Sequence, residues 1–257
     1  MNIVVCIKQT LNTEAHIVLD SSGKIDDKGI SLIINPYDEY AIEEGLRLKE
    51  KFGGVVTVVS IGGAKAQEAI RSAQAVGVDK GILISDADVE NADEWVKAEI
   101  LAKAISQIPY DLILSGRTAI DDGSSQVAVR LAEALNISSV SSVLKLEVEG
   151  SQATVTREID GGTEVIAVAL PVVITAQKGL NNPRYPTVAG IMKAKRKELK
   201  NMTLAELDLN ADNLAPKMSV QKISLPNVRK IGRKIEGEAA QEAQELARLL
   251  REEAKVL

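Results

Sequence analysis

A run of small and polar residues at positions 115–126 has a composition suited to holding a phosphate group. It follows a short apolar segment and precedes a segment of helical period, so we expect it to connect a strand to a helix. The first backbone amides of a helix lack intrahelical partners, and together with the helix dipole they favour an anion. Residues 124–127 should supply these amides, and the small side chains of the loop would let a phosphate approach closely.

A purely structural interpretation of this loop competes with phosphate binding. Asp122 or Ser124 could cap the helix, because both residue types are common at helix starts. The loop matches neither a Walker sequence nor a G-x-G-x-x-G fingerprint. Its spacing alone leaves both interpretations open.

Two further polar residues stand near expected strand ends or helix starts. Lys8 leaves the first strand at its carboxyl end, where parallel sheets bind ligands, although lysines at strand ends are also commonly just solvated. Asn35 precedes Pro36, and the pair is typical of a helix cap. Asn35 would contribute to a ligand site only if it faced the same crevice as the loops after Ile7 and Ser60.

The segment 181–192 contains two prolines and an aromatic residue but has no helix or strand period, so we expect an ordered loop. Val188, Ile191 and Met192 would form a docking patch if they are exposed together. If they are buried, they would close the core instead. The basic run that follows, at 193–200, is typical of a solvated face.

Residue counts exclude several kinds of chemistry. Cys6 is the only cysteine and His16 the only histidine, so an internal disulfide or a thiolate zinc cluster is impossible, and a catalytic triad would depend on these two residues. We therefore expect no catalytic residues and no metal site. A net charge of −5 gives no electrostatic reason to bind nucleic acid. With no leader and no apolar run near the ~20 residues that span a bilayer, we expect a cytoplasmic protein without membrane insertion.

The elements that must position these residues alternate along the first half of the chain. Short apolar runs at 2–8, 55–60, 81–84 and 112–114 predict strands buried on both faces, and the segments between them have helical period. Such alternation predicts a doubly wound α/β fold with a mostly parallel sheet. Ligands bind beyond the carboxyl ends of such strands.

The second half has a different pattern. Apolar and polar residues alternate at 144–149, 153–158 and 164–170, which predicts an antiparallel meander at one sheet edge, followed by a buried strand at 172–175. Residues 200–233 have little periodicity, and an amphipathic helix is expected from about residue 238. We therefore expect a nucleotide-binding domain at 1–200 and an extended arm with a C-terminal helix at 201–257.

Four segments, taken in order, resemble the beta subunit of electron transfer flavoproteins, and the resemblance runs from residue 1 to about 209. They are Asn35-Pro36 with the following Glu43-Glu44 helix, Ala119-Ile120-Asp121-Asp122 through Gln126, Arg157-Glu158-Ile159-Asp160-Gly161-Gly162, and Pro183-Arg184-Tyr185 leading to Ile191-Met192-Lys193-Ala194-Lys195.

The resemblance implies a carrier subunit rather than an enzyme. In this family an alpha subunit carries most of the site for a redox-active FAD, and the beta subunit commonly buries a structural AMP. No bond of that AMP is made or broken. The positions that match the AMP site are Cys6, Lys8, Asn35, Ser60, Ile61, Gly62, Ala119, Asp122, Gly123, Ser124, Ser125, Gln126 and Val127.

Electron-bifurcating members of the family hold a second FAD in the same pocket and use NADH. This chain departs from their phosphate loop at several positions of 121–129, and its segments 157–162 and 180–185 look more like AMP-binding members. The resemblance therefore favours AMP.

The resemblance also implies partner contacts. Val188 matches the apolar anchor of a loop that docks on a partner dehydrogenase, with Ile191 and Met192 beside it, and Glu158 matches a carboxylate that faces the alpha subunit's flavin domain. Electrons would pass from an acyl-CoA or related dehydrogenase, as in fatty acid oxidation, to a membrane quinone oxidoreductase or similar acceptor. Residues 10–13 depart from relatives that carry an aspartate there, so direct contact with the alpha-bound flavin is not implied.

Two other classes of function compete. An ATP-cleaving enzyme of the adenine-nucleotide hydrolase-like superfamily would share this sheet, but it would want a Ser-Gly-Gly-x-Asp-Ser-type loop where this chain has Lys8-Gln9-Thr10-Leu11-Asn12. A stand-alone nucleotide-sensing module is the other alternative. The arm after residue 200 and the amphipathic C-terminal helix favour a chain that wraps a partner.

Overall fold

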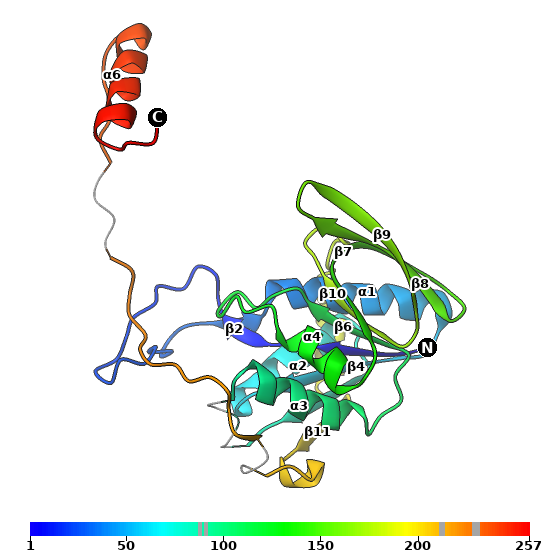
Figure 1. Ribbon diagram of the computed structural model, residues 1–257. Helices are drawn as coiled ribbons and strands as arrows, with labels where there is room; N and C mark the ends of the chain where they lie inside the picture. Colours follow the sequence, from blue (N-terminus) through cyan, green and yellow to red (C-terminus); the bar gives the residue numbers. More distant parts are fainter. Residues whose placement is uncertain (87–88, 90–91, 211–213, 228–231) are drawn as a thin grey trace.

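The computed structural model describes residues 1–86, 89, 92–210, 214–227 and 232–257. In these ranges a nine-stranded sheet forms the centre of the molecule, with helices on both faces (Figure 1). Its strands lie in the order β11 (Leu199–Met202), β5 (Lys80–Ile84), β4 (Val55–Ile61), β1 (Asn2–Cys6), β6 (Leu112–Gly116), β10 (Val172–Ala176), β7 (Ser138–Glu149), β8 (Gln152–Ile159) and β9 (Gly162–Ala169).

The sheet is parallel from β11 to β7, and β8 and β9 complete it as an antiparallel meander at one edge. The expected doubly wound α/β fold with its edge meander is therefore confirmed. The chain runs from β1 outward to β4 and β5, then returns to β6 on the other side of β1. This reversal makes the β1–β6 boundary the switch point at which such sheets bind ligands.

The helices of the described ranges are α1 (Pro36–Phe52), α2 (Gln67–Val76), α3 (Glu94–Ile105), α4 (Val127–Ala134), α5 (Val188–Ala194) and α6 (Ala239–Glu252), with 3₁₀ turns η1 (Ala64–Ala66) and η3 (Ala205–Leu207). Successive side chains of β1 point to opposite faces. Ile3 and Val5 pack towards α1 and α2, whereas Val4 and Cys6 pack towards α3 and α4. Burial on both faces explains the continuous apolar run. None of these helices combines the length and the apolar composition needed to cross a bilayer.

A small antiparallel pair, β2 (Gln9–Leu11) with β3 (Leu32–Ile34), lies apart from the main sheet, just after β1 and just before α1. It was not predicted. It brings the end of β1 close to the start of α1, because the Asn35 amide donates to the Lys8 carbonyl at 2.9 Å.

The expected loop at 181–192 was wrong in its second half, which forms α5. Thr187 caps this helix by accepting a hydrogen bond from the Gly190 amide at 3.0 Å. A Cβ at Gly190 would lie 2.2 Å from the Ala75 carbonyl oxygen of α2, so a glycine is needed for the close packing of the two helices. A helix this short has no amphipathic period to detect, because tertiary contact rather than propensity stabilises it.

The segment before α5 is tied to α1. Arg184 bonds Glu43 at 2.8 Å through Nε and Glu50 at 2.5 Å through Nη1. Asn181 donates to Glu44 at 2.9 Å. Two of the segments that carry the family resemblance, far apart in sequence, therefore contact each other through buried carboxylates.

The chain beyond residue 200 begins inside the folded unit. β11 spans the expected domain boundary at residue 200 and pairs with β5, and Leu204, Leu207 and Leu214 are buried beneath α3. The apparent lack of periodicity at 200–210 therefore reflects very short elements that belong to the folded unit.

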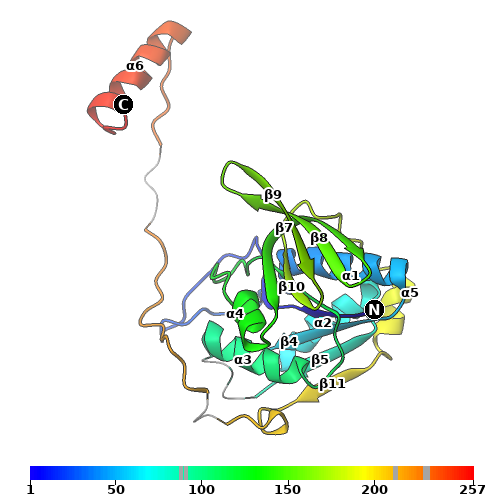
Figure 2. The same ribbon diagram turned by 45° about the vertical axis from the view of Figure 1, so that its right-hand side comes forward.

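The exposed arm starts at a clamp on α3. Asp93 caps α3 by accepting from the Val96 amide at 2.9 Å, and it also accepts from the amides of Lys217 at 2.5 Å and Met218 at 3.0 Å. The Lys217 ammonium lies 4.4 Å from the centre of the Trp95 ring. Residues 219–227 are exposed beyond this clamp, and α6 has no buried residue. Figure 2 shows α6 standing well away from the sheet.

Candidate functional site

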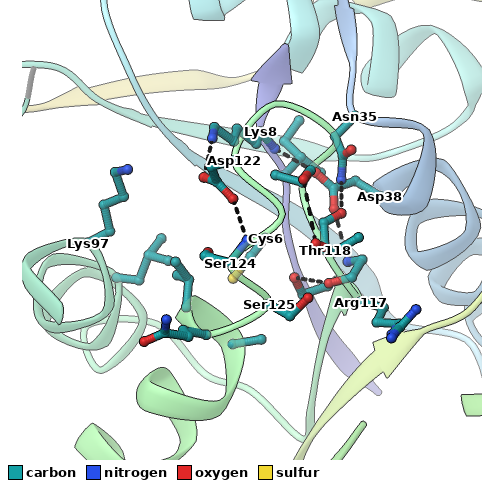
Figure 3. Close-up of a pocket in the computed structure, with 18 of the residues that line it drawn as sticks. Cys6, Lys8, Asn35, Asp38, Lys97, Arg117, Thr118, Asp122, Ser124 and Ser125 are labelled. Carbon is teal, nitrogen blue, oxygen red and sulfur yellow. Dashed lines mark hydrogen bonds and ion pairs between the residues drawn. The ribbon is translucent and has the colours of Figure 1, made fainter. Parts of the chain in front are cut away.

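A cleft opens at the carboxyl ends of β1 and β6, on the face of the sheet covered by α3 and α4 (Figure 3). Cys6 and Ser115, which are register partners on these two strands, lie at its base. The apolar part of its wall comes from Ile7, Ile61, Leu101, Ala119, Val127 and Ala128. The polar part comes from Lys8, Asn35, Asp38, Lys97, Arg117, Thr118, Asp122, Ser124, Ser125 and Gln126.

The loop from β6 to α4 folds on itself. Asp122 accepts a hydrogen bond from the Ser124 amide at 2.9 Å, and the Gly123 amide donates to the Ala119 carbonyl at 2.9 Å. Gly123 and Ser125 both adopt positive φ, at 64° and 56°. The Ser124 amide is therefore already used, and the helix begins at Val127 rather than at Ser124 as expected.

The start of α4 carries no side-chain cap from any described residue. Asp122 bonds within the loop instead, so the capping interpretation of Asp122 and Ser124 is wrong. Because the first amides of a helix have no intrahelical acceptor, those of residues 127–129 remain able to bind an anion. Val127 and Ala128 belong to the cleft wall.

Asn35 does not cap α1 with its side chain. Its Nδ2 donates to the Thr118 carbonyl at 2.9 Å, and its Oδ1 accepts from the Ile120 amide at 3.2 Å. The side chain is almost completely buried and fastens the β6–α4 loop to the start of α1. Asn35 thus faces the same crevice as Ile7 and Ile61, which was the condition for a role in the site.

Asp38, like Asn35, was expected from the sequence only as a candidate cap of the helix and not as a site residue. Its carboxylate accepts from the Lys8 amide at 2.7 Å and from the Gly116 amide at 2.9 Å, so it joins the ends of β1 and β6 from within α1. Burial raises the pKa of Asp38 to about 7, against the opposing effect of these hydrogen bonds. A Cβ at Gly116 would lie 2.4 Å from an Asp38 oxygen, so only glycine fits opposite it.

Lys8 is paired with two carboxylates of the loop, Asp121 at 2.7 Å and Asp122 at 2.8 Å. Burial lowers the pKa of Lys8, but the hydrogen bonds and charges of the two aspartates outweigh it, so the pKa lies above its usual value. The three groups form a cluster with one net negative charge. Lys8 therefore contributes to loop structure rather than acting as a free cation.

The Cys6 thiol is buried at the base of the cleft. Burial, with a smaller contribution from the Asp38 charge, raises its pKa to about 12. The thiol stays protonated at neutral pH, so its nucleophilicity is low.

Three of the expected site residues do not line the cleft. Ser60 is fully buried, and strand alternation turns it towards the α1–α2 face, whereas its neighbours Val59 and Ile61 pack on the α3–α4 face. Gly62 donates to the Ile84 carbonyl at 3.1 Å and packs on Ala66. Gly123 forms the turn of the loop without reaching the wall.

Lys97 and Leu101 were also missed. Both reach the cleft from α3, and their i, i+4 spacing puts them on one helix face. That spacing was visible in the sequence, but it does not show which cleft the face borders. Among the described residues, no hydrogen bond or ion pair engages the Lys97 ammonium.

The expected docking residues lie outside the cleft on two elements. Val188, Ile191 and Met192 are exposed on α5, with Val188 at 81% exposure, so the alternative that they close the core is wrong. Glu158 is exposed on β8 and accepts a hydrogen bond from Gln177. No group of three or more metal-ligating side chains occurs within the described ranges.

Comparison with known proteins fits this architecture. Residues 22–207 match the family model described as "Electron transfer flavoprotein domain". An electron transfer flavoprotein subunit beta from Bacillus subtilis is 45% identical over 258 residues and covers the whole of both chains. One from Syntrophomonas wolfei is 44% identical over all of this chain and 98% of its own length. The human one is 37% identical over 92% of this chain and 93% of its own length. The chain therefore belongs to the electron transfer flavoprotein beta subunit family, which makes it one subunit of a flavin-dependent electron carrier that also has an alpha subunit.

Proposed function

We propose that this protein binds a structural AMP in the cleft at the β1–β6 switch point and supports the FAD of its alpha subunit. The heterodimer carries electrons from an acyl-CoA or related dehydrogenase to a membrane quinone oxidoreductase or a similar acceptor. The observation that carries the nucleotide proposal is the uncapped start of α4 at the wall of the cleft.

The residues of the cleft fit a nucleotide. The free amides at 127–129 suit a phosphate, and a slot lined by Ile7, Ile61 and Leu101 suits an adenine ring. Asn35 and Asp38 hold the loop and the two strand ends in place without needing a ligand to do so. A cleft organised in this way binds a nucleotide without large rearrangement.

The groups of the cleft are suited to holding a nucleotide rather than cleaving it. Cys6 is protonated, Asp122 is paired with Lys8, and Asp38 is engaged by two backbone amides. The FAD of the complex, held mainly by the alpha subunit, supplies the redox-active ring when bound. In this proposal AMP stabilises the beta subunit and takes no part in electron transfer.

We assign the partner-docking role to α5, where Val188, Ile191 and Met192 form an exposed apolar patch. Thr187 and the close contact at Gly190 fix the helix on α2, so the patch is presented on a rigid element. Glu158 would contact the alpha subunit's flavin domain, and the exposed arm beyond Met218 would extend onto the alpha subunit through α6.

One experiment tests the cofactor assignment. The heterodimer is purified with its alpha subunit, denatured, and its FAD and AMP are quantified per dimer. One FAD and one AMP are expected. Two FAD and no AMP would identify the electron-bifurcating type instead, and a colourless single chain that hydrolyses ATP would overturn the proposal.

A further inference from the structure

We propose that Lys97 is the cation that neutralises the nucleotide phosphate and, together with Asp121 and Asp122, restricts the cleft to nucleoside monophosphates. This inference rests on the proposed function, in which the cleft holds a nucleotide. Nothing in the sequence had marked Lys97 for such a role.

Lys97 is the cation on the α3 wall of the cleft that is free to meet a ligand. Of the three cations at the wall, Lys8 is committed to Asp121 and Asp122. Arg117 is exposed, and Figure 3 shows its guanidinium pointing away from α3 on the opposite side of the cleft. Lys97 is half-buried, and among described residues its ammonium has no partner.

The position of Lys97 suits a phosphate at the start of α4. α3 and α4 pack side by side on the same face of the sheet, and Lys97 and Val127 line the same cleft from the two helices. A phosphate at the amides of 127–129 would therefore share one cleft with the helix dipole of α4 and with the flexible Lys97 side chain. Charge-assisted hydrogen bonds of this kind are about twice as strong as neutral ones.

The local charges match one phosphate and not more. A phosphate monoester carries close to two negative charges at neutral pH, and Lys97 with the helix start supplies about 1.5 positive charges. Each further phosphate would add negative charge beside the Lys8–Asp121–Asp122 cluster, which already has one net negative charge. No other uncommitted cation of the described cleft wall faces that cluster from α3. Repulsion there disfavours a diphosphate or a triphosphate.

The test uses Lys97→Met in the purified heterodimer, because methionine keeps the length and the helix propensity of lysine and removes only its charge. Lys103→Met is the matched control, since Lys103 is exposed on the same helix and does not line the cleft. Dissociation constants for AMP and for adenosine are measured by equilibrium dialysis with labelled nucleotide. For Lys97→Met we expect an AMP constant about 10- to 100-fold higher. The adenosine constant should not change, and Lys97→Arg should restore AMP binding.

A second variant tests the selection of phosphate number. Asp121→Asn removes one charge from the cluster but leaves intact the hydrogen bond that the Ser124 amide donates to Asp122. We expect the ratio of ADP to AMP affinity to rise about tenfold, by removal of one nearby repulsion.

Different results would contradict this inference and the proposed function. A wild-type heterodimer that binds no AMP would overturn the proposed function itself. Normal AMP binding by the wild type, together with equal AMP constants for the Lys97 and Lys103 variants, would overturn the role of Lys97 alone. If Asp121→Asn left the ratio of ADP to AMP affinity unchanged, the two aspartates would have no role in selecting the number of phosphates. A parallel loss of adenosine binding in Lys97→Met would make Lys97 a structural residue.

Discussion

Asp38 joins β1 to β6 through two amide hydrogen bonds, and its burial gives the folded protein a carboxyl group with a pKa of about 7. This pKa lies above the ordinary value of 3.8. At a pH between these two values, folding is therefore accompanied by the binding of a proton to Asp38. Stability from this group is therefore fully present below about pH 4 and is lost as the pH rises through 7.

We predict that Asp38→Asn removes part of the pH dependence of stability. Urea unfolding at pH 5 and pH 7.5 should show the wild type losing on the order of 2 kcal/mol more than the variant over this interval. The variant will also be less stable at both values, because an amide cannot accept from both strand ends. Asp160→Asn, at an exposed turn, is the control. If the free energy of unfolding changed equally with pH in the wild type and in Asp38→Asn, burial of Asp38 would not be the cause of the pH dependence.

Asn35 is the second residue whose hydrogen bonds organise the wall of the cleft. We predict that Asn35→Ala leaves the Thr118 carbonyl and the Ile120 amide without partners and lowers the free energy of unfolding by about 1 to 3 kcal/mol. The loop it fastens forms the cleft wall, so the AMP content of the heterodimer should fall as well. Thermal unfolding and nucleotide quantification on one sample check both effects. If the Asn35→Ala heterodimer kept a full complement of AMP, the β6–α4 loop would not be needed for AMP binding.

At this scale the sequence predicted residue types better than residue partners. Asn35 and Asp38 were expected as helix caps and Lys97 was missed, because position along a helix does not reveal which distant loop a side chain meets. Ser60 was a different kind of error. Ser60 and Ile61 are adjacent in one strand, so only one of them can face the cleft, and alternation alone could have excluded the other.

Among the elements, α5 carries the clearest exposed apolar surface. We predict that Val188→Ala raises the apparent KM for the partner dehydrogenase severalfold, and Val188→Asp by more, since an apolar anchor contributes about 1 to 2 kcal/mol. The melting temperature should hardly change, because Val188 is 81% exposed. Dehydrogenase-coupled flavin reduction measures the first effect. Val165→Ala is the control, because Val165 is 68% exposed on β9 and lies on a different element. Unchanged coupling in the Val188 variants would rule out docking at this residue.

Element prediction succeeded where the pattern was long and failed where it was short. The buried strands β1, β4, β5 and β6 and the meander β7–β9 were confirmed, since each carries a continuous or alternating apolar pattern. The short elements α5, β11 and the β2–β3 pair were not expected. Gly190 packing on α2 and the pairing of β11 with β5 stabilise them, and such long-range contacts leave no local signal.

For the whole molecule, the feature to test is the exposed amphipathic helix α6, which we propose packs on the alpha subunit. We predict that deleting residues 237–257 raises the dissociation constant of the heterodimer at least about tenfold, because burial of even one leucine side chain contributes about 1.5 to 3 kcal/mol. The deletion should not affect unfolding of the isolated chain, since α6 has no buried residue there. Sedimentation of the mixed subunits measures the constant. The same constant for the truncated and full chains would place α6 outside the interface.

The clamp that starts the arm also gives the protein an optical property. The chain has one tryptophan, so all of its indole emission comes from Trp95, whose ring lies under the Lys217 ammonium. Emission depends on nearby charge and solvent, and lifting the arm would remove a cation from one face of the ring. Unlabelled protein can therefore report arm movement through the colour and lifetime of a single chromophore.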